Sequence, residues 1–70
     1  MKLKANDYEP REVIRIIREW TEKSQKDFGN SIGVTRYTIQ GYELGRRHFT
    51  FETFMEIANL YDITVTIEKK

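Results

Sequence analysis

The sequence predicts a mainly α-helical fold of four helices, with a short β-strand at each end of the chain. Apolar residues recur at helical spacing in four segments, each of which begins at a proline or at a side chain that caps helices. Strict alternation of apolar and polar residues is confined to the two ends. The 70 residues, 39% of them hydrophobic and 33% charged, suit a single small domain, residues 1–70.

The first and last predicted helices supply much of the expected core. The first covers about residues 10–22, where Pro10 suits the first helical position because no backbone N–H is needed there. The last covers about residues 51–61 and begins after Thr50, whose hydroxyl can cap it. Four aromatic side chains are predicted to belong to the core: Trp20, Phe28, Phe54 and Tyr61.

Two short helices joined by a tight turn are the most informative feature of the sequence. Ser24 is a capping residue for a helix over about residues 25–32, and Thr35 is one for a helix over about residues 36–44. Gly33 suits the positive φ that a turn of this length needs. Because the connection is so short, we expect the two helices to cross steeply, as in a helix-turn-helix.

The motifs of this region extend beyond the turn. They are SQKDFG at 24–29, IGVT at 32–35, TI at 38–39 and YELGRR at 42–47. Together, over roughly residues 13–63, they resemble the phage repressor and Cro type of helix-turn-helix domain, the XRE family. The chain departs from the family pattern at Gly29, where Ala is usual, and at Gly41, where a polar residue is common. The resemblance implies a lambda-repressor-like fold, with the helix-turn-helix at about 25–44, that binds double-stranded DNA in a bacterium or phage.

The outer face of the helix over 36–44 carries the predicted base contacts. Ile39 and Tyr42 are expected to face the core, which leaves Arg36, Tyr37 and Gln40 on the opposite face. A helix fits the major groove, which is about 12 Å wide. There Arg36 can offer two donors to guanine, Gln40 can pair with adenine, and Tyr37 can contact a thymine methyl group or a phosphate.

The rest of the predicted interface consists of Gln25, Thr35, Arg46 and Arg47. Gln25 begins a helix whose free backbone N–H groups favour a phosphate, and the resemblance implies the same contact. Arg46 and Arg47 follow the recognition helix and would hold the DNA backbone without reading sequence. Residues 34–50 contain three arginines and one glutamate, a local charge of +2.

Two further residues near the interface are given other roles. The resemblance implies that Arg18 pairs with Glu43 and so locks the first helix to the recognition helix. Gly41 has no side chain, so we expect it to allow a close approach of the DNA, at a cost of about 1 kcal/mol in helix stability.

Composition excludes several classes of function. With no Cys and one His, the chain can form neither a disulfide framework nor a Cys- or His-rich metal site, so we expect no cofactor and no metal. It has no apolar run that could span a membrane and no signal peptide, which predicts a cytoplasmic protein. Because so short a chain must bury most of its apolar residues, it leaves little room for an active site, and we expect no enzyme.

The ends of the chain suggest partners. Residues 1–5 and 63–67 alternate in polarity and are predicted strands, so the second could pair with its copy in a homodimer. Pairing of the two ends within one chain is the alternative, and both can coexist in one sheet. Either Phe49 or Phe51 is expected to stay exposed for a partner protein.

Three functions remain open at this stage. The first is a small transcriptional regulator, acting as a repressor or activator through its abundance or a partner. The second is an antitoxin that uses the same DNA-binding fold and also holds a toxin. The third is a protein-interaction module that has lost DNA binding, which the modest net charge of +1 and Gly41 favour slightly.

Overall fold

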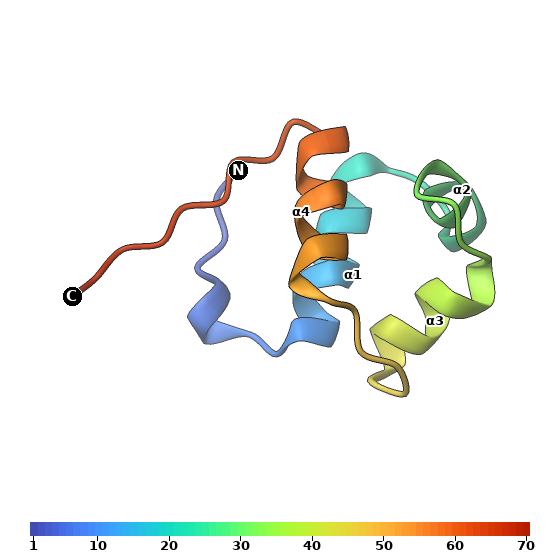
Figure 1. Ribbon diagram of the computed structural model, residues 1–70, viewed down its shortest axis with the longest axis horizontal. Coiled ribbons are helices and arrows are strands. Elements are labelled where there is room, and N and C mark those ends of the chain that lie inside the picture. Colours follow the sequence, from blue (N-terminus) through green and yellow to red (C-terminus); the bar gives the residue numbers. More distant parts are fainter.

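The computed structural model describes residues 1–70. A short 3-10 helix, η1 (Ala5–Asp7), precedes four α-helices, which are α1 (Pro10–Thr21), α2 (Gln25–Ser31), α3 (Arg36–Leu44) and α4 (Phe51–Leu60). In Figure 1, α1 and α4 overlap in the middle of the molecule, α2 and α3 lie to one side, and both chain ends lie to the other. The four predicted helices are confirmed, and no helix has the length and apolar character needed to cross a membrane.

The core lies where the inner faces of the four helices meet. Side chains from every helix are buried in it: Val13, Ile14, Ile17, Phe28, Ile39, Ile57 and Ala58. Half-buried residues surround this cluster, among them Trp20, Phe54 and Tyr61, so the predicted core aromatics are confirmed. The Phe28 and Tyr61 rings stack with their centroids 5.4 Å apart, which ties α2 to the end of α4.

Hydroxyl side chains cap three of the helices. Ser24 Oγ accepts a hydrogen bond from the Asp27 N–H at 3.1 Å. The Thr35 and Thr50 hydroxyls accept equivalent bonds from the backbone three residues further on. These bonds satisfy backbone donors that the first turn of a helix leaves free, which is why the helices begin where the sequence predicts.

The turn between α2 and α3 is closed by backbone contacts. Gly33 has φ of +76°, a left-handed conformation that favours glycine. The Val34 N–H donates to the Gly29 carbonyl at 2.9 Å. A Cβ on Gly29 would lie 2.8 Å from the Val34 carbonyl oxygen, so the turn packs directly on this glycine. The departure from the usual Ala at Gly29 thus accompanies a close approach of the turn to α2.

The predicted terminal strands are wrong for this single chain, because the structure contains no β-strand. Ala5 is part of η1 instead, and the Ile63 N–H bonds back to Ala58 at the end of α4. Beyond that bond, residues 64–70 make no backbone-to-backbone hydrogen bond. The alternation of polarity does indicate segments with one apolar side, since Leu3 and Ile63 pack on the core. A strand also needs a neighbouring strand to accept its backbone hydrogen bonds, and alternation does not supply one.

Candidate nucleic-acid interface

The outer face of α3 is free of the rest of the protein. Arg36, Tyr37 and Gln40 are all exposed, and Tyr37 is 65% exposed. On the opposite face Ile39 is fully buried and Tyr42 is half-buried against the core. The predicted division of this helix into a core face and an outer face is therefore confirmed.

Arg36 and Tyr37 contact each other at the start of this face. The Arg36 guanidinium donates a hydrogen bond to the Tyr37 hydroxyl at 3.1 Å and lies over the Tyr37 ring, 5.0 Å from its centroid. The hydrogen bond and the positive charge of Arg36 lower the pKa of the Tyr37 hydroxyl below its ordinary value. In the free protein Tyr37 thus holds the guanidinium over its ring, above the N-terminal turn of α3.

A polar network beneath this face fixes α3 to its neighbours. Arg18 donates to both carboxylate oxygens of Glu43, at 2.7 and 3.0 Å, so the predicted pair between α1 and α3 is present. The hydrogen bond to Glu43 is the main reason why the pKa of Arg18 lies above its ordinary value. The Glu43 side chain is only 6% exposed, which makes the pair a structural element and not a surface contact.

Gln25 joins the same network. Its side-chain amide donates to Glu43 Oε1 at 3.3 Å, and the residue is half-buried at the start of α2. In the free protein this side chain therefore points toward α3. Contact between Gln25 and phosphate stays a prediction, and so does contact between Thr35 and DNA, since the Thr35 hydroxyl already caps α3.

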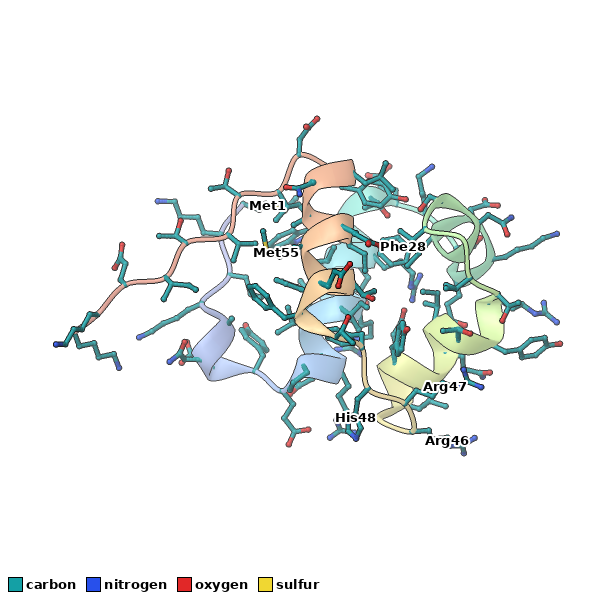
Figure 2. The ribbon with its side chains drawn as sticks, viewed as in Figure 1. Met1, Phe28, Arg46, Arg47, His48 and Met55 are labelled. Carbon is teal, nitrogen blue, oxygen red and sulfur yellow. The ribbon has the colours of Figure 1, made fainter.

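The loop after α3 carries the cations of the interface. Arg46 and Arg47 are exposed and lie with His48 between α3 and α4 (Figure 2). The N–H groups of Arg46 and Arg47 both donate to the Gly41 carbonyl, at 2.9 and 3.1 Å. Gly45 has φ of +75° and reverses the chain at the end of α3. The loop is thus held against the helix that precedes it.

The structure assigns Gly41 a neighbour that sequence reasoning missed. Gly41 is buried, and a Cβ there would lie 3.0 Å from Cδ and 3.1 Å from Cγ of Arg47. In the free chain the Arg47 side chain occupies the space beside Gly41 where the sequence predicts a close approach of the DNA. The only signal in the sequence is that Gly stands at position 41, where the helix-turn-helix family commonly has a polar residue.

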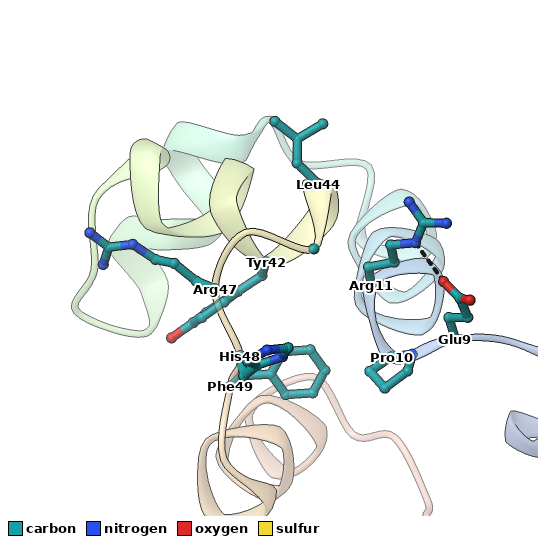
Figure 3. Close-up of a pocket in the computed structure, with 9 residues that line it drawn as sticks. Glu9, Pro10, Arg11, Tyr42, Leu44, Arg47, His48 and Phe49 are labelled. Atoms are coloured by element: carbon teal, nitrogen blue, oxygen red, sulfur yellow. Dashed lines mark hydrogen bonds and ion pairs between the residues drawn. The ribbon is translucent and has the colours of Figure 1, made fainter.

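An open pocket of about 500 Å³ lies between the start of α1 and the end of α3 (Figure 3). Its lining consists of Glu9, Pro10, Arg11, Tyr42, Leu44, Gly45, Arg47, His48 and Phe49. On one side the Arg11 guanidinium is paired with Glu9 at 2.7 Å. The walls of this pocket come from segments far apart in the chain, so no local pattern in the sequence predicts it.

Comparison with known proteins agrees with this geometry. A family model described as helix-turn-helix matches residues 14–67, from the second turn of α1 to the segment beyond α4. No curated protein and no solved structure matches the chain.

Proposed function

Since the chain belongs to the XRE-type helix-turn-helix family of DNA-binding domains, we propose that it is a small transcriptional regulator that recognises a specific sequence in double-stranded DNA. The observation that carries the proposal is the outer face of α3. Three side chains suited to reading base edges project from it, while its inner face is anchored in the core. A bacterial or phage regulator of this kind acts in the cytoplasm and uses no cofactor.

In the proposed complex α3 enters the major groove. The Arg36 guanidinium offers its planar fork to the O6 and N7 atoms of guanine, and Gln40 pairs with adenine. Tyr37 contacts a thymine methyl group or a phosphate. To reach a base, Arg36 exchanges its hydrogen bond with Tyr37 for bonds to guanine.

The phosphate contacts come from both sides of this helix. Arg46 and Arg47 contribute two exposed positive charges from the loop after α3. Gln25 is the first residue of α2 and Thr35 is the N-cap of α3, so both lie at helix N-termini, which favour an anion. These contacts orient the domain on the duplex and carry no sequence information themselves.

Selection from a random duplex library, followed by binding titrations, tests the proposal. Arg36→Ala should relax the preference at one base pair by about 1–3 kcal/mol and leave the salt dependence nearly unchanged. Arg46→Ala should weaken binding to all duplexes alike and lower the slope of log affinity against log salt by about one. The pair of variants separates base reading from phosphate binding.

Equal affinity of the wild-type chain for selected and random duplexes would refute a specific regulator. A chain that binds no duplex at all would instead be an interaction module that has kept the fold. The matched control is Lys26→Ala, which removes an exposed charge from α2 outside the proposed contact set. It should leave the selected sequence unchanged.

We further propose that residues 63–67 join two copies of the chain. The free backbone groups after Ile63 and the exposed Ile67, at 85%, suit pairing with the same segment of a second copy. A dimer would place two recognition helices in successive major grooves, about 34–36 Å apart. A selected site with two-fold symmetry would support this arrangement.

The dimer can be tested by sedimentation at micromolar concentration with and without the selected duplex. Ile67→Lys should shift the equilibrium toward monomer, because it places a charge on the apolar face of the segment. Thr66→Lys, which changes the neighbouring side chain on the opposite face, is the control and should have a smaller effect. A wild-type chain that is monomeric both free and on DNA would overturn this part of the proposal.

A further inference from the structure

The side chains of Arg46 and Arg47 differ in how they pack against α3. Both arginines donate their backbone N–H groups to the Gly41 carbonyl, so the loop that carries them is anchored at a single point of α3. It is the aliphatic stem of Arg47 that supplies the three atoms nearest to a Cβ at Gly41, with Cδ at 3.0 Å, Cγ at 3.1 Å and Cβ at 3.4 Å. Gly41 has no side chain, yet it is buried, so atoms of neighbouring residues cover its backbone.

The position where the Arg47 stem packs on Gly41 lies beside the proposed DNA-reading face. Tyr37 precedes Gly41 by one helical turn, so the two positions lie on the same side of α3. The Arg47 stem therefore lies along the edge of the face that carries Arg36 and Gln40. Figure 3 shows the Arg47 guanidinium directed away from Pro10 and Arg11, on the far side of the pocket.

A stem that is held in place changes what the guanidinium can do. A free arginine loses side-chain conformational entropy when it binds a phosphate, at a cost that reduces the net gain. A side chain already packed on the helix loses less on binding. The absence of a side chain at position 41 thus gives the loop arginine a fixed position at the edge of the recognition helix.

We propose that Gly41 is a positioning residue for DNA binding: by leaving α3 bare, it seats the stem of Arg47 and preorganises its guanidinium for the phosphate backbone. This inference rests on the proposed function, since it assigns a role within the same interface. It replaces the view that Gly41 allows DNA itself to approach the helix. Gly41 contacts no DNA in this arrangement and acts through Arg47.

The test is a double-mutant cycle of Gly41→Ala with Arg47→Ala. Gly41→Ala should weaken binding to selected and random duplexes by the same factor, because a displaced Arg47 loses a sequence-independent contact. Between about 50 and 200 mM salt, loss of one phosphate contact changes the fall in affinity by roughly threefold, and Gly41→Ala should approach that change. In the Arg47→Ala background the same substitution should have no further effect.

Gly41→Ala paired with Arg46→Ala is the matched control. Since Arg47, and not Arg46, supplies the atoms nearest to Gly41, these two effects should add. The midpoint temperature of thermal unfolding should not fall in Gly41→Ala, because Ala is a better helix former than Gly. Weaker binding by this variant therefore cannot be attributed to unfolding. Additive effects with Arg47→Ala, or a loss restricted to the selected duplex with an unchanged salt slope, would overturn the inference.

A second measurement needs no DNA and so separates this inference from the proposed function. Nuclear magnetic resonance relaxation of the arginine Nε–H groups should show Arg47 more ordered than Arg46 in the free wild-type chain. Gly41→Ala should lower the order of Arg47 and leave that of Arg46 unchanged. Equal disorder of the two side chains in the wild type would show that Gly41 seats nothing, whether or not the chain binds DNA.

Discussion

The helix-turn-helix of α2 and α3 and the segment after Ile63 differ in where their backbone groups find partners. In the helix-turn-helix, helical bonds, two hydroxyl caps and the bond from Val34 to Gly29 hold the chain closed on itself. Residues 64–70 make no such bond. The first region carries its fixed shape by itself, whereas the second has to obtain backbone partners from water or from another chain.

This difference suits two different roles in recognition. A helix that is fixed before DNA arrives loses little conformational entropy on binding, so its side-chain contacts contribute more fully to affinity. An extended segment with free backbone groups gains hydrogen bonds only when a second strand is added. The comparison therefore predicts that substitutions in the first region change stability and that substitutions in the second change association.

The largest effect is expected at Phe28, which is fully buried in α2 and stacked on Tyr61. Phe28→Ala should destabilise the domain by about 3–5 kcal/mol, because it leaves a cavity among buried side chains. A single core of this size supplies only a few kcal/mol of net stability, so the variant should be largely unfolded. Circular dichroism with urea titration measures the change.

Ile67→Ala is the matched control for Phe28→Ala. It removes apolar atoms from a side chain that is 85% exposed, and its effect on the unfolding free energy should stay within about 0.5 kcal/mol. A loss of several kcal/mol in Ile67→Ala, measured at a concentration where the chain is monomeric, would erase the contrast between the two regions.

A second, smaller effect is expected at the Arg18–Glu43 pair that locks α3 to α1. Arg18→Met should destabilise the domain by about 3 kcal/mol, because it leaves the Glu43 carboxylate nearly buried without its cation. The double variant with Glu43→Met should recover much of this loss, since an apolar pair of similar size needs no partner. Urea unfolding of Arg18→Met, Glu43→Met and the double variant gives the coupling energy, and a double variant no more stable than Arg18→Met would contradict this explanation.

The helices could be predicted because their signals are local. Ser24, Thr35 and Thr50 each precede an apolar stripe at helical spacing, and a hydroxyl there bonds to the backbone three residues further on whatever the rest of the chain does. Gly33 and Gly45 both have the positive φ that their positions suggest. The division of α3 into a core face and an outer face follows from the same spacing.

The terminal strands, which are wrong, and the contacts that the sequence did not predict both depend on partners distant in sequence. Alternating polarity in residues 63–67 cannot say whether a second strand is available, and within one chain none is. The contact of Gln25 with phosphate stays a prediction, and its bond to Glu43, which no local signal indicates, depends on how α2 crosses α3. The seat of Arg47 on Gly41 likewise depends on the path of the loop after Gly45.

The smallest expected effect is at the Arg36–Tyr37 contact, which the proposed base contact of Arg36 would have to open. Arg36 lowers the pKa of the Tyr37 hydroxyl, so the tyrosinate form is more favourable in the folded chain than in the unfolded chain. The resulting stabilisation is fully present above the ordinary tyrosine pKa and is lost as pH falls through the lowered one. Ultraviolet titration follows ionisation of the tyrosines, and subtracting the curve of Tyr37→Phe isolates Tyr37. The pKa of Tyr37 should be below its ordinary value in the wild type and at its ordinary value in Arg36→Ala. If both proteins titrate alike, the guanidinium does not rest on the ring in solution, and no contact with Tyr37 would have to open for the proposed binding of Arg36 to guanine.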